Sequence, residues 1–398
     1  MSKKMVPPDG RKRALEHLRL LKMASSAHAF MRGSTDQFYD WVENGKVSKG
    51  LPSGPPIWIC GDCHTGNLGP VADLKGNIDI QIRDLDQTVI GNPACDLIRL
   101  AVSLAMAARS ADLPGVTTAL MCEAMIEAYT AALAGQLPKE KVEEVPPLNK
   151  VMQSSLKRKW RHLAEERIED VRPSIPLGRK FWPLTKEEKS GLEKLLDDPE
   201  RRDFLRLLTR NKNKDKVSLV DAAYWVKGCS SLGRVRYAAL VQVAKSYRLI
   251  DIKEATKAIA PPIQAGKMPA NNAQRVVMGA QHLSPFLGER TLAASLGGHQ
   301  VVIRELRPQD VKFELSDLTQ REAVLTAKLF AGVVGQAHGR QMKSGVRSAW
   351  RKDLKTGRSK NLDAPSWLWK SVVELVGLHE ASYLEHCRKF ALSEAAAP

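Results

Sequence analysis

The chain has 398 residues, and 43% of them are apolar, so a packed core is expected and intrinsic disorder is excluded. Lys and Arg outnumber Asp and Glu by 61 to 44, and the formal net charge of +17 favours polyanionic partners: nucleotide phosphates, nucleic acid or an anionic membrane surface. No apolar segment is long enough to cross a bilayer, and no signal-peptide pattern follows the basic N-terminus. The sequence therefore predicts a cytoplasmic protein without a membrane span, whose basic surface either binds polyanions or serves only solubility.

One pair among the six cysteines has the spacing of a metal-binding or redox motif. Cys60 and Cys63 form a CxxC, and His64 adjoins it. A zinc site normally takes a second cysteine pair or histidines at ligand spacing, and Gly-Asp between the cysteines is unusual for a thioredoxin-like motif. Structural thiols in a reducing compartment are therefore favoured over metal or redox use.

The first third of the chain mixes helical and strand-like segments. Residues 11–45 are predicted to be helical with a break near Gly33-Ser34, and residues 46–56, rich in Gly, Pro and Ser, form a linker. Hydrophobic periodicity then predicts a strand at 57–60, a strand at 78–82, a helix at 94–109 and a further helix to about 134.

A charged segment follows at residues 135–215. It is predicted to be mostly helical, with breaks at its prolines. The basic run 157–161 within it is either a solvated helix face or a contact surface for phosphate or RNA.

The composition changes at about residue 222, where a strand-rich segment begins. A strand at 224–226 leads through the Gly-rich loop Gly228–Gly233 into an alternating strand at 235–243. The next predicted elements are, in chain order, a strand at 247–252, a helix at 272–283, strands at 291–294 and 300–304, and an amphipathic helix at 318–338. The remainder is helical and basic.

A short loop after the first strand carries the residue types of a phosphotransfer site. Asp62 and Asn67 are five positions apart, which matches the D-x-x-x-x-N pattern of kinase catalytic loops. Such a loop aims a carboxylate at the acceptor hydroxyl while an amide oxygen reaches the divalent cation beside the phosphates. Asp62 is therefore the predicted catalytic residue, and Asn67 a predicted metal ligand.

Further carboxylates are needed to complete a metal site. Asp84 directly follows the strand 78–82, and two adjacent strands would bring it to the same sheet edge as Asp62. Asp86 either shares the metal or holds the loop by hydrogen bonds. Mg²⁺ takes few protein carboxylates and completes its shell with phosphate oxygens and water. Asp96, near the start of the next helix, is predicted to hold the catalytic-loop backbone rather than act only as a favourable helix-terminal charge.

These motifs resemble those of known phosphotransferases. The run from Gly61-Asp62-x-His64-x-x-Asn67 through Asp84-Leu85-Asp86 to Asn92-Pro93-x-x-Asp96 is similar to the signature of aminoglycoside phosphotransferases and choline kinases. A longer series resembles an uncharacterised bacterial family, known as a domain of unknown function and grouped with the kinase-like clan. That series comprises Lys22–Ser25, Phe30–Gly33, Arg99–Ala101, Ser231–Gly233 and Lys253–Ala255, and it covers most of the chain outside about 140–215.

The order of the motifs implies a rearranged kinase-like chain. In an ordinary kinase the Gly-rich loop and its lysine precede the catalytic loop, whereas here they follow it. The sequence therefore predicts an α+β, helix-rich, bilobal protein-kinase-like fold in circularly permuted form. The expected parts are a C-lobe-like helical part at 1–221 with a charged insertion at 140–215, an N-lobe-like sheet at 222–306, and a helical part at 307–398 that completes the C-lobe.

The nucleotide-binding half is assigned to this later segment. Backbone amides of the Gly-rich loop would lie over the phosphates, and Lys253 would supply a point charge to them. The predicted loop residues are Gly228, Ser230, Ser231 and Gly233. A plain hairpin turn and an exposed lysine at the end of a strand remain the alternatives.

One departure from the kinase pattern concerns the helix at 272–283. A kinase places a Glu on the helix that faces its lysine, but this helix contains none, and Gln274, Met278 and Gln281 are its expected inward residues. Lys253 would then pair near Glu254 or with no residue.

Two basic residues near the loop have open roles. His64 is assigned to the catalytic loop, either as a loop-stabilising hydrogen-bond donor or in binding the acceptor. Arg32 either binds phosphate or substrate or supports the first helices.

The leading functional hypothesis is transfer of a phosphoryl group from ATP, with Mg²⁺, to a hydroxyl of a small molecule rather than of a protein. The first alternative is a non-catalytic kinase-like protein that binds nucleotide, or RNA through its basic surface. A metal-dependent phosphoesterase is less favoured, because the chain lacks the further Asp-x-His and Asn-His ligand pairs.

Overall fold

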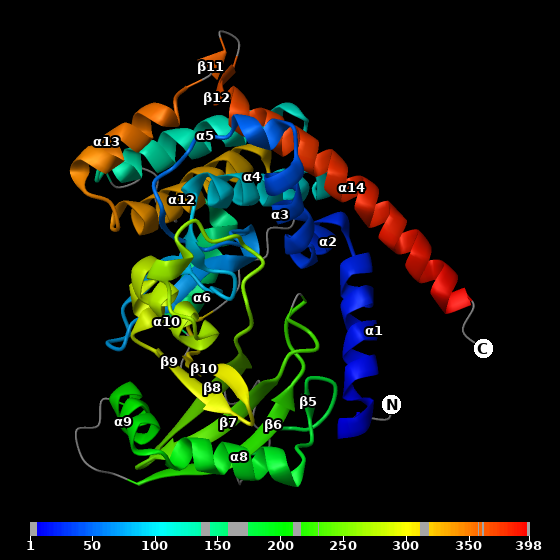
Figure 1. The fold of residues 1–398 in the computed structure, drawn as a ribbon, viewed down its shortest axis with the longest axis vertical. Helices are drawn as coiled ribbons and strands as arrows, with labels where there is room; N and C mark the ends of the chain where they lie inside the picture. Colours follow the sequence, from blue (N-terminus) through cyan, green and yellow to red (C-terminus); the bar gives the residue numbers. More distant parts are fainter. Residues whose placement is uncertain are drawn as a thin grey trace.

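The computed structural model describes residues 6–136, 144–157, 174–209, 216–229, 231–310, 318–356, 358–359 and 362–395. The fold is mixed α+β and helix-rich, as predicted. A helical part and an antiparallel six-stranded sheet lie one beside the other, and the long helix α14 projects from the helical part (Figure 1). Within the described ranges, no helix is long and apolar enough to cross a membrane.

The helical part is built around α4 (Pro93–Ser110), whose side chains are almost all buried. Asn92 caps this helix by accepting a hydrogen bond from the Ala94 backbone, and Pro93 suits its first turn. Helix α5 (Val116–Leu133) packs closely on α12 (Gln320–Gly339). The remaining helices of this part are α1 (Arg11–Ala24), α2 (Ala27–Gly33), α3 (Thr35–Asn44), α6 (Pro146–Lys157), α13 (Ser344–Asp353) and α14 (Ser366–Ala395).

Two small antiparallel sheets carry the candidate catalytic loops. Strand β1 (Ile57–Ile59) pairs with β4 (Val89–Gly91), and β2 (Leu68–Ala72) pairs with β3 (Ile78–Ile82). The predicted strands at 57–60 and 78–82 are confirmed. The expectation that these two strands are adjacent in one sheet is wrong, because each pairs with a partner that the sequence did not reveal. A third two-stranded sheet joins β11 (Arg358–Ser359) to β12 (Leu362–Pro365).

The six-stranded sheet has the order β5-β6-β7-β8-β10-β9. Its strands are β5 (Phe181–Trp182), β6 (Val217–Trp225), β7 (Arg236–Val243), β8 (Ser246–Glu254), β9 (Thr291–Leu296) and β10 (His299–Leu306). The expected boundary at residue 222 therefore falls inside β6, and the sheet also recruits β5 from the charged segment. Both features are hard to find in the sequence, because β5 has two residues and most of the first six residues of β6 are half-buried or exposed.

The two faces of this sheet have different neighbours. Helices α8 (Lys186–Asp197) and α9 (Pro199–Leu208) cover one face, where Ile250 and Ile252 join a cluster of buried leucines and valines. Side chains alternate along a strand, so Asp251 and Lys253 lie on the face opposite to Ile250 and Ile252. The strand pattern of β8 thus places Lys253 on the face from which it contacts Asp84 and Asp86.

Helix α10 (Asn272–Leu283) and the short α11 (Pro285–Gly288) lie between the sheet and the helical part. Asn271 caps α10 through its side chain, which accepts from the Gln274 backbone. A Cβ on Gly279 would lie within 2.3 Å of Thr88, so glycine at this position lets α10 approach the segment between β3 and β4. The predicted helix at 272–283 is confirmed.

A buried charge network connects the six-stranded sheet to the candidate catalytic loop. Asp310 pairs with Arg290 at 3.0 Å and with Arg304 at 3.4 Å, and Arg304 also donates to the Arg83 carbonyl at 2.9 Å. Arg83 in turn donates from its backbone to the Asn67 carbonyl at 2.7 Å. Burial alone would raise the pKa of Asp310, but the surrounding guanidinium groups hold it well below its usual range.

Candidate functional site

The loop Gly61–Asn67 connects β1 to β2 and has a tightly specified backbone. Gly61 has φ +76°, and a Cβ there would lie 2.2 Å from the Gln87 carbonyl oxygen, so only glycine fits. Its carbonyl accepts a hydrogen bond of 2.6 Å from Tyr39 Oη. The backbone amides of Cys60 and Gly61 donate to the two carboxylate oxygens of Asp96 at 2.7 and 2.9 Å. Asp96 thus makes the contacts that its predicted supporting role requires.

Asp96 is anchored from the far side by a chain of buried side chains. His338 Nε2 lies 3.1 Å from Asp96 Oδ2, and its Nδ1 lies 2.8 Å from Tyr129 Oη. Trp350 Nε1 donates to the same Tyr129 hydroxyl at 3.2 Å. The helices α4, α5, α12 and α13 therefore converge on the backbone that precedes Asp62. Such a fully hydrogen-bonded buried network rigidifies its surroundings.

Asp62 is buried and is held by a charged partner. Its Oδ1 accepts from Arg99 Nε at 2.9 Å, and Arg99 is fully buried and also donates to the Met31 carbonyl at 2.7 Å. Burial raises the pKa of Asp62, and the Arg99 charge opposes that rise. His64 Nε2 lies 3.8 Å from the other carboxylate oxygen, Oδ2. Asp62 therefore has one oxygen fixed by Arg99 and the other directed toward His64.

Asn67 closes the loop on itself. Its Nδ2 donates to the Asp62 backbone carbonyl at 2.9 Å. This contact uses the amide nitrogen and leaves Oδ1, to which none of the residues described in the structure donates. An oxygen of this kind, fixed in position and free to bind, is what a hard divalent cation takes from a protein amide.

The acidic loop Asp84–Asp86 faces the sheet. Lys253 Nζ lies 3.4 Å from both carboxylate oxygens of Asp84 and forms an ion pair with Asp86. Arg234 reaches Asp86 Oδ2 at 3.7 Å. The expectation that Lys253 pairs near Glu254 or with no residue is wrong: the lysine reaches across to the acidic loop, while Glu254 accepts from the Val235 backbone at 2.9 Å.

The two carboxylates of this loop differ in electrostatic state. Partial desolvation of the half-exposed Asp84 carboxylate opposes its ionisation, but Lys253 and Arg236 outweigh it and hold the pKa of Asp84 well below its usual range. Burial and the neighbouring Asp84 charge raise the pKa of Asp86. Asp84 also adds to the rise in the pKa of Asp62, after burial has raised it. The Asp84 carbonyl lies 3.5 Å from Cys60 Sγ, so the acidic loop approaches the loop of Asp62 although β1 and β3 are not paired.

The atoms that could bind a metal ion between the acidic loop and the loop Gly61–Asn67 are oxygens. Among the described residues, no group of three or more His, Cys, Asp and Glu side chains lies at metal-binding spacing. Asp84, Asp86 and Asn67 supply two carboxylates and one amide oxygen, and the Asp84 side chain is 47% exposed. This set fits Mg²⁺, which keeps waters and phosphate oxygens in its shell, and it differs from the donor sets of zinc sites. Cys60 and Cys63 are fully buried.

Helix α10 contributes a cation, Arg275, to the acidic loop. Arg275 donates to the Asp86 carbonyl and to the Thr256 carbonyl, both at 2.9 Å, and it also contacts the Thr88 carbonyl. Burial lowers the pKa of Arg275 to about 10. Gln274 and Gln281, which the sequence placed inward, are exposed. The inward positions belong instead to Ala273, Arg275, Val276, Gly279, Ala280 and Leu283.

The Gly-rich loop lies between β6 and β7. Gly228 and Gly233 have φ +101° and +98°, and a Cβ on Gly228 would lie 2.2 Å from Ser231 Oγ. Lys22 on α1 donates to the Gly228 carbonyl at 2.7 Å, so the N-terminal helix holds the start of the loop. Ser230 lies outside the described residues. The loop and Lys253 sit on neighbouring strands, which pair Arg236 with Lys253.

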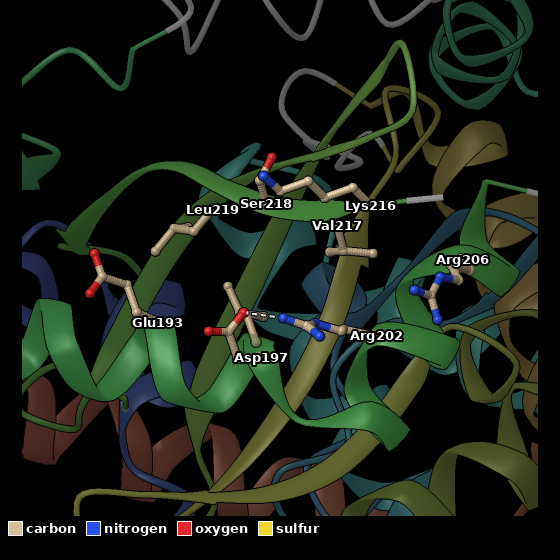
Figure 2. Close-up of a pocket in the computed structure, with 9 residues that line it drawn as sticks. Glu193, Asp197, Arg202, Arg206, Lys216, Val217, Ser218 and Leu219 are labelled. Carbon is tan, nitrogen blue, oxygen red and sulfur yellow. Dashed lines mark hydrogen bonds and ion pairs between the residues drawn. The ribbon is translucent and has the colours of Figure 1, made fainter. Parts of the chain in front are cut away.

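The cavity shown in Figure 2 lies elsewhere. Its volume is about 580 Å³, and it is lined by α8, α9 and the start of β6. Asp197 and Arg202 pair across it at 2.6 Å. None of its lining residues is a predicted site residue.

Three residues of the site escaped prediction. Arg99 interrupts an apolar helix, and a charge in such a helix signals a buried partner, but the sequence does not show that the partner is Asp62. His338 and Arg275 lie in amphipathic helices without any local pattern that marks them. Their contacts join segments 242 and 189 positions apart in the chain.

Comparison with known proteins assigns the chain to a family but matches it to no individual protein. No curated protein and no solved structure matches it. A family profile matches residues 11–389, which confirms the predicted resemblance to an uncharacterised bacterial family. The chain belongs to this family, DUF2252, described as an uncharacterized protein conserved in bacteria.

Proposed function

We propose that the chain is an ATP- and Mg²⁺-dependent phosphotransferase that acts on a hydroxyl group of a small molecule. The observation that carries this proposal is the ion pairing of Lys253, on the sheet, with Asp84 and Asp86, beside the loop that holds Asp62 and Asn67. Carboxylates, an amide oxygen and a lysine at the seam of two structural parts are the groups that phosphoryl transfer requires.

Each residue has a distinct role in this proposal. Asp62 positions the acceptor hydroxyl and takes its proton, and burial suits this role because it brings the pKa of the carboxyl up from its usual range. Asp84, Asp86 and Asn67 would hold Mg²⁺, which neutralises charge on the phosphates when bound. Lys253 then turns from the acidic pair to the phosphates, and the loop at Gly228, Ser231 and Gly233 covers them.

The fold that fits this function is a protein-kinase-like fold in circularly permuted order. In support, the antiparallel sheet carries the Gly-rich loop on β6–β7 and Lys253 on β8, with α10 following. The catalytic and acidic loops come earlier in the chain, from the helical part. Helix α12, which follows the sheet, returns to contact the catalytic loop through His338 and Asp96.

One observation favours a second candidate, a non-catalytic protein that binds nucleotide or RNA. Helix α10 places Arg275, not a glutamate, at the acidic loop, so Lys253 lacks the kinase ion pair. In this candidate the acidic loop and Lys253 neutralise each other permanently, and the net charge of +17 provides the attraction for polyanions.

Substitution of Lys253 separates the two candidates. We expect Lys253→Met to weaken binding of Mg-ADP and Mg-ATP by about 10- to 100-fold, since one charge-assisted contact to phosphate contributes about 1.5–3 kcal/mol. Isothermal titration calorimetry measures the affinities. Lys245→Met, at an exposed turn between β7 and β8, is the matched control and should leave them unchanged. Equal affinities for wild type and Lys253→Met would refute the nucleotide role of this lysine.

A further inference from the structure

A second cation, Arg32, lies beside the candidate catalytic loop. Arg32 lies at the end of α2 and is partly buried. Among the described residues, none accepts a hydrogen bond from it or forms an ion pair with it, and its Nε atom is buried without a partner. By contrast, the neighbouring Arg99 is fully paired, with Asp62 and the Met31 carbonyl. A partly buried guanidinium whose Nε atom has no partner has lost water contacts there, and an anionic ligand would compensate for that loss.

The position of Arg32 is set by Gly66 in the catalytic loop. A Cβ at Gly66 would lie 2.8 Å from Arg32 Nη2 and 3.2 Å from His64 Cε1. The guanidinium and the edge of the imidazole therefore meet over Gly66, in space that glycine leaves open. This point lies between Asp62 and Asn67 in the chain, on the loop that is proposed to face the acceptor.

In the described part of the chain, His64 has one ring nitrogen, Nδ1, without a partner near the same point. Its side chain is only 5% exposed, and Nδ1 is buried with no hydrogen-bond partner in the described part of the chain. Burial, with the charges of Arg32 and Arg99, lowers the pKa of His64 well below its usual range. The imidazole is thus neutral and can donate one hydrogen bond, so that the positive charge here belongs to Arg32.

The start of the Gly-rich loop lies near the end of α2. Arg32 is followed by Gly33, where a Cβ would lie 3.4 Å from Cys229 Sγ, next to Gly228. The Arg32 charge therefore sits beside the loop of Asp62 and near the loop that is proposed to cover the phosphates.

We propose that Arg32 and His64 form an oxyanion subsite that binds a carboxylate or phosphate group of the acceptor, next to its reacting hydroxyl. Arg32 provides a planar fork of donors that matches either oxyanion, and His64 adds a donor from the loop. The acceptor is then an anionic hydroxyl compound, such as a hydroxy acid or a phosphorylated alcohol. The claim that the bound anion belongs to the acceptor rests on the proposed function. The claim that Arg32 binds an anion is independent of it.

Thermal unfolding with inorganic phosphate tests the subsite, with sodium chloride adjusted to constant ionic strength. We expect phosphate to raise the Tm of the wild-type protein, because a ligand that binds the folded state stabilises it. Arg32→Gln should lose most of this rise, and Arg32→Lys should keep part of it. Arg13→Gln removes an exposed charge on α1 and should behave as wild type. A phosphate-dependent rise in Arg32→Gln equal to that of wild type would overturn the subsite.

Calorimetric titration with Mg-ADP and Mg-ATP identifies the source of the anion. If the acceptor supplies it, Arg32→Gln and wild type bind both nucleotides with equal affinity. A loss of Mg-ATP affinity alone would place the subsite on the terminal phosphate of the nucleotide and overturn the acceptor assignment. Failure of the wild type to bind any nucleotide would refute the proposed function and the acceptor assignment with it, while the phosphate-dependent rise in Tm would still support the subsite.

Discussion

Asp62→Asn is expected to reduce phosphoryl transfer by about 10²- to 10⁴-fold, the contribution that a positioned general base makes. Asn retains the size of Asp62 and an oxygen that accepts from Arg99, but it cannot take a proton. The rate is measured as release of the γ-phosphate of radiolabelled ATP to water and to hydroxyl compounds of a bacterial small-molecule extract. Transfer by the wild type should also fall as the pH decreases through the raised pKa of Asp62, because only the carboxylate acts as a base.

Two measurements keep this result interpretable. Calorimetry should show that Asp62→Asn binds Mg-ADP as the wild type does, since Asp62 does not hold the nucleotide in the proposal. Asp79→Asn, at an exposed carboxylate on β3, should retain normal transfer. Transfer at the wild-type rate by Asp62→Asn would show that the loop Gly61–Asn67 is not catalytic.

Asp96→Ala is expected to lower the free energy of unfolding by about 3–5 kcal/mol, which is the usual effect of removing one partner from a buried charged network. Asp96 is fully buried and accepts hydrogen bonds from the Cys60 and Gly61 backbone amides. Its removal leaves both amides and His338 without an acceptor. Urea unfolding followed by tryptophan fluorescence measures the change.

The effect of Asp96 on phosphoryl transfer can be measured separately from its effect on the free energy of unfolding. Asp96→Asn keeps one acceptor oxygen, so it should fold with a smaller loss of stability and still misplace the Asp62 loop, with reduced transfer. Asp36→Ala, at an exposed carboxylate on α3, should change stability by less than about 0.5 kcal/mol. An Asp96→Asn protein with unaltered transfer would contradict the positioning role.

Hydrophobic periodicity in the sequence predicts the positions of the long helices. The helices α4, α10 and α12 lie close to their predicted bounds, because long runs of apolar residues at helical spacing mark each of them in the sequence. The short strands β2, β4 and β5 were missed. Two or three residues carry no measurable periodicity, and β2 contains Gly69 and Pro70, which sequence rules exclude from strands.

The candidate site was predictable where its residues lie close together in the chain. The spacing of Asp62, Asn67, Asp84 and Asp86 marks two short loops, and local pattern rules find such loops. The partners of these residues come from distant segments: Arg99 for Asp62 and Lys253 for both carboxylates of the acidic loop. Tertiary packing alone decides such pairings, so a single sequence does not reveal that Asp84 and Asp86 are the partners of Lys253.

The dependence of nucleotide binding on Mg²⁺ tests the central claim most directly. Wild-type protein is titrated calorimetrically with ATP, first with Mg²⁺ and then with EDTA in its place. If Asp84, Asp86 and Asn67 hold Mg²⁺ and Lys253 turns to the phosphates, ATP binds with Mg²⁺ and at least about tenfold more weakly with EDTA, because the acidic pair then repels the phosphates. An affinity that is equal with and without Mg²⁺, or no binding in either condition, would contradict the account.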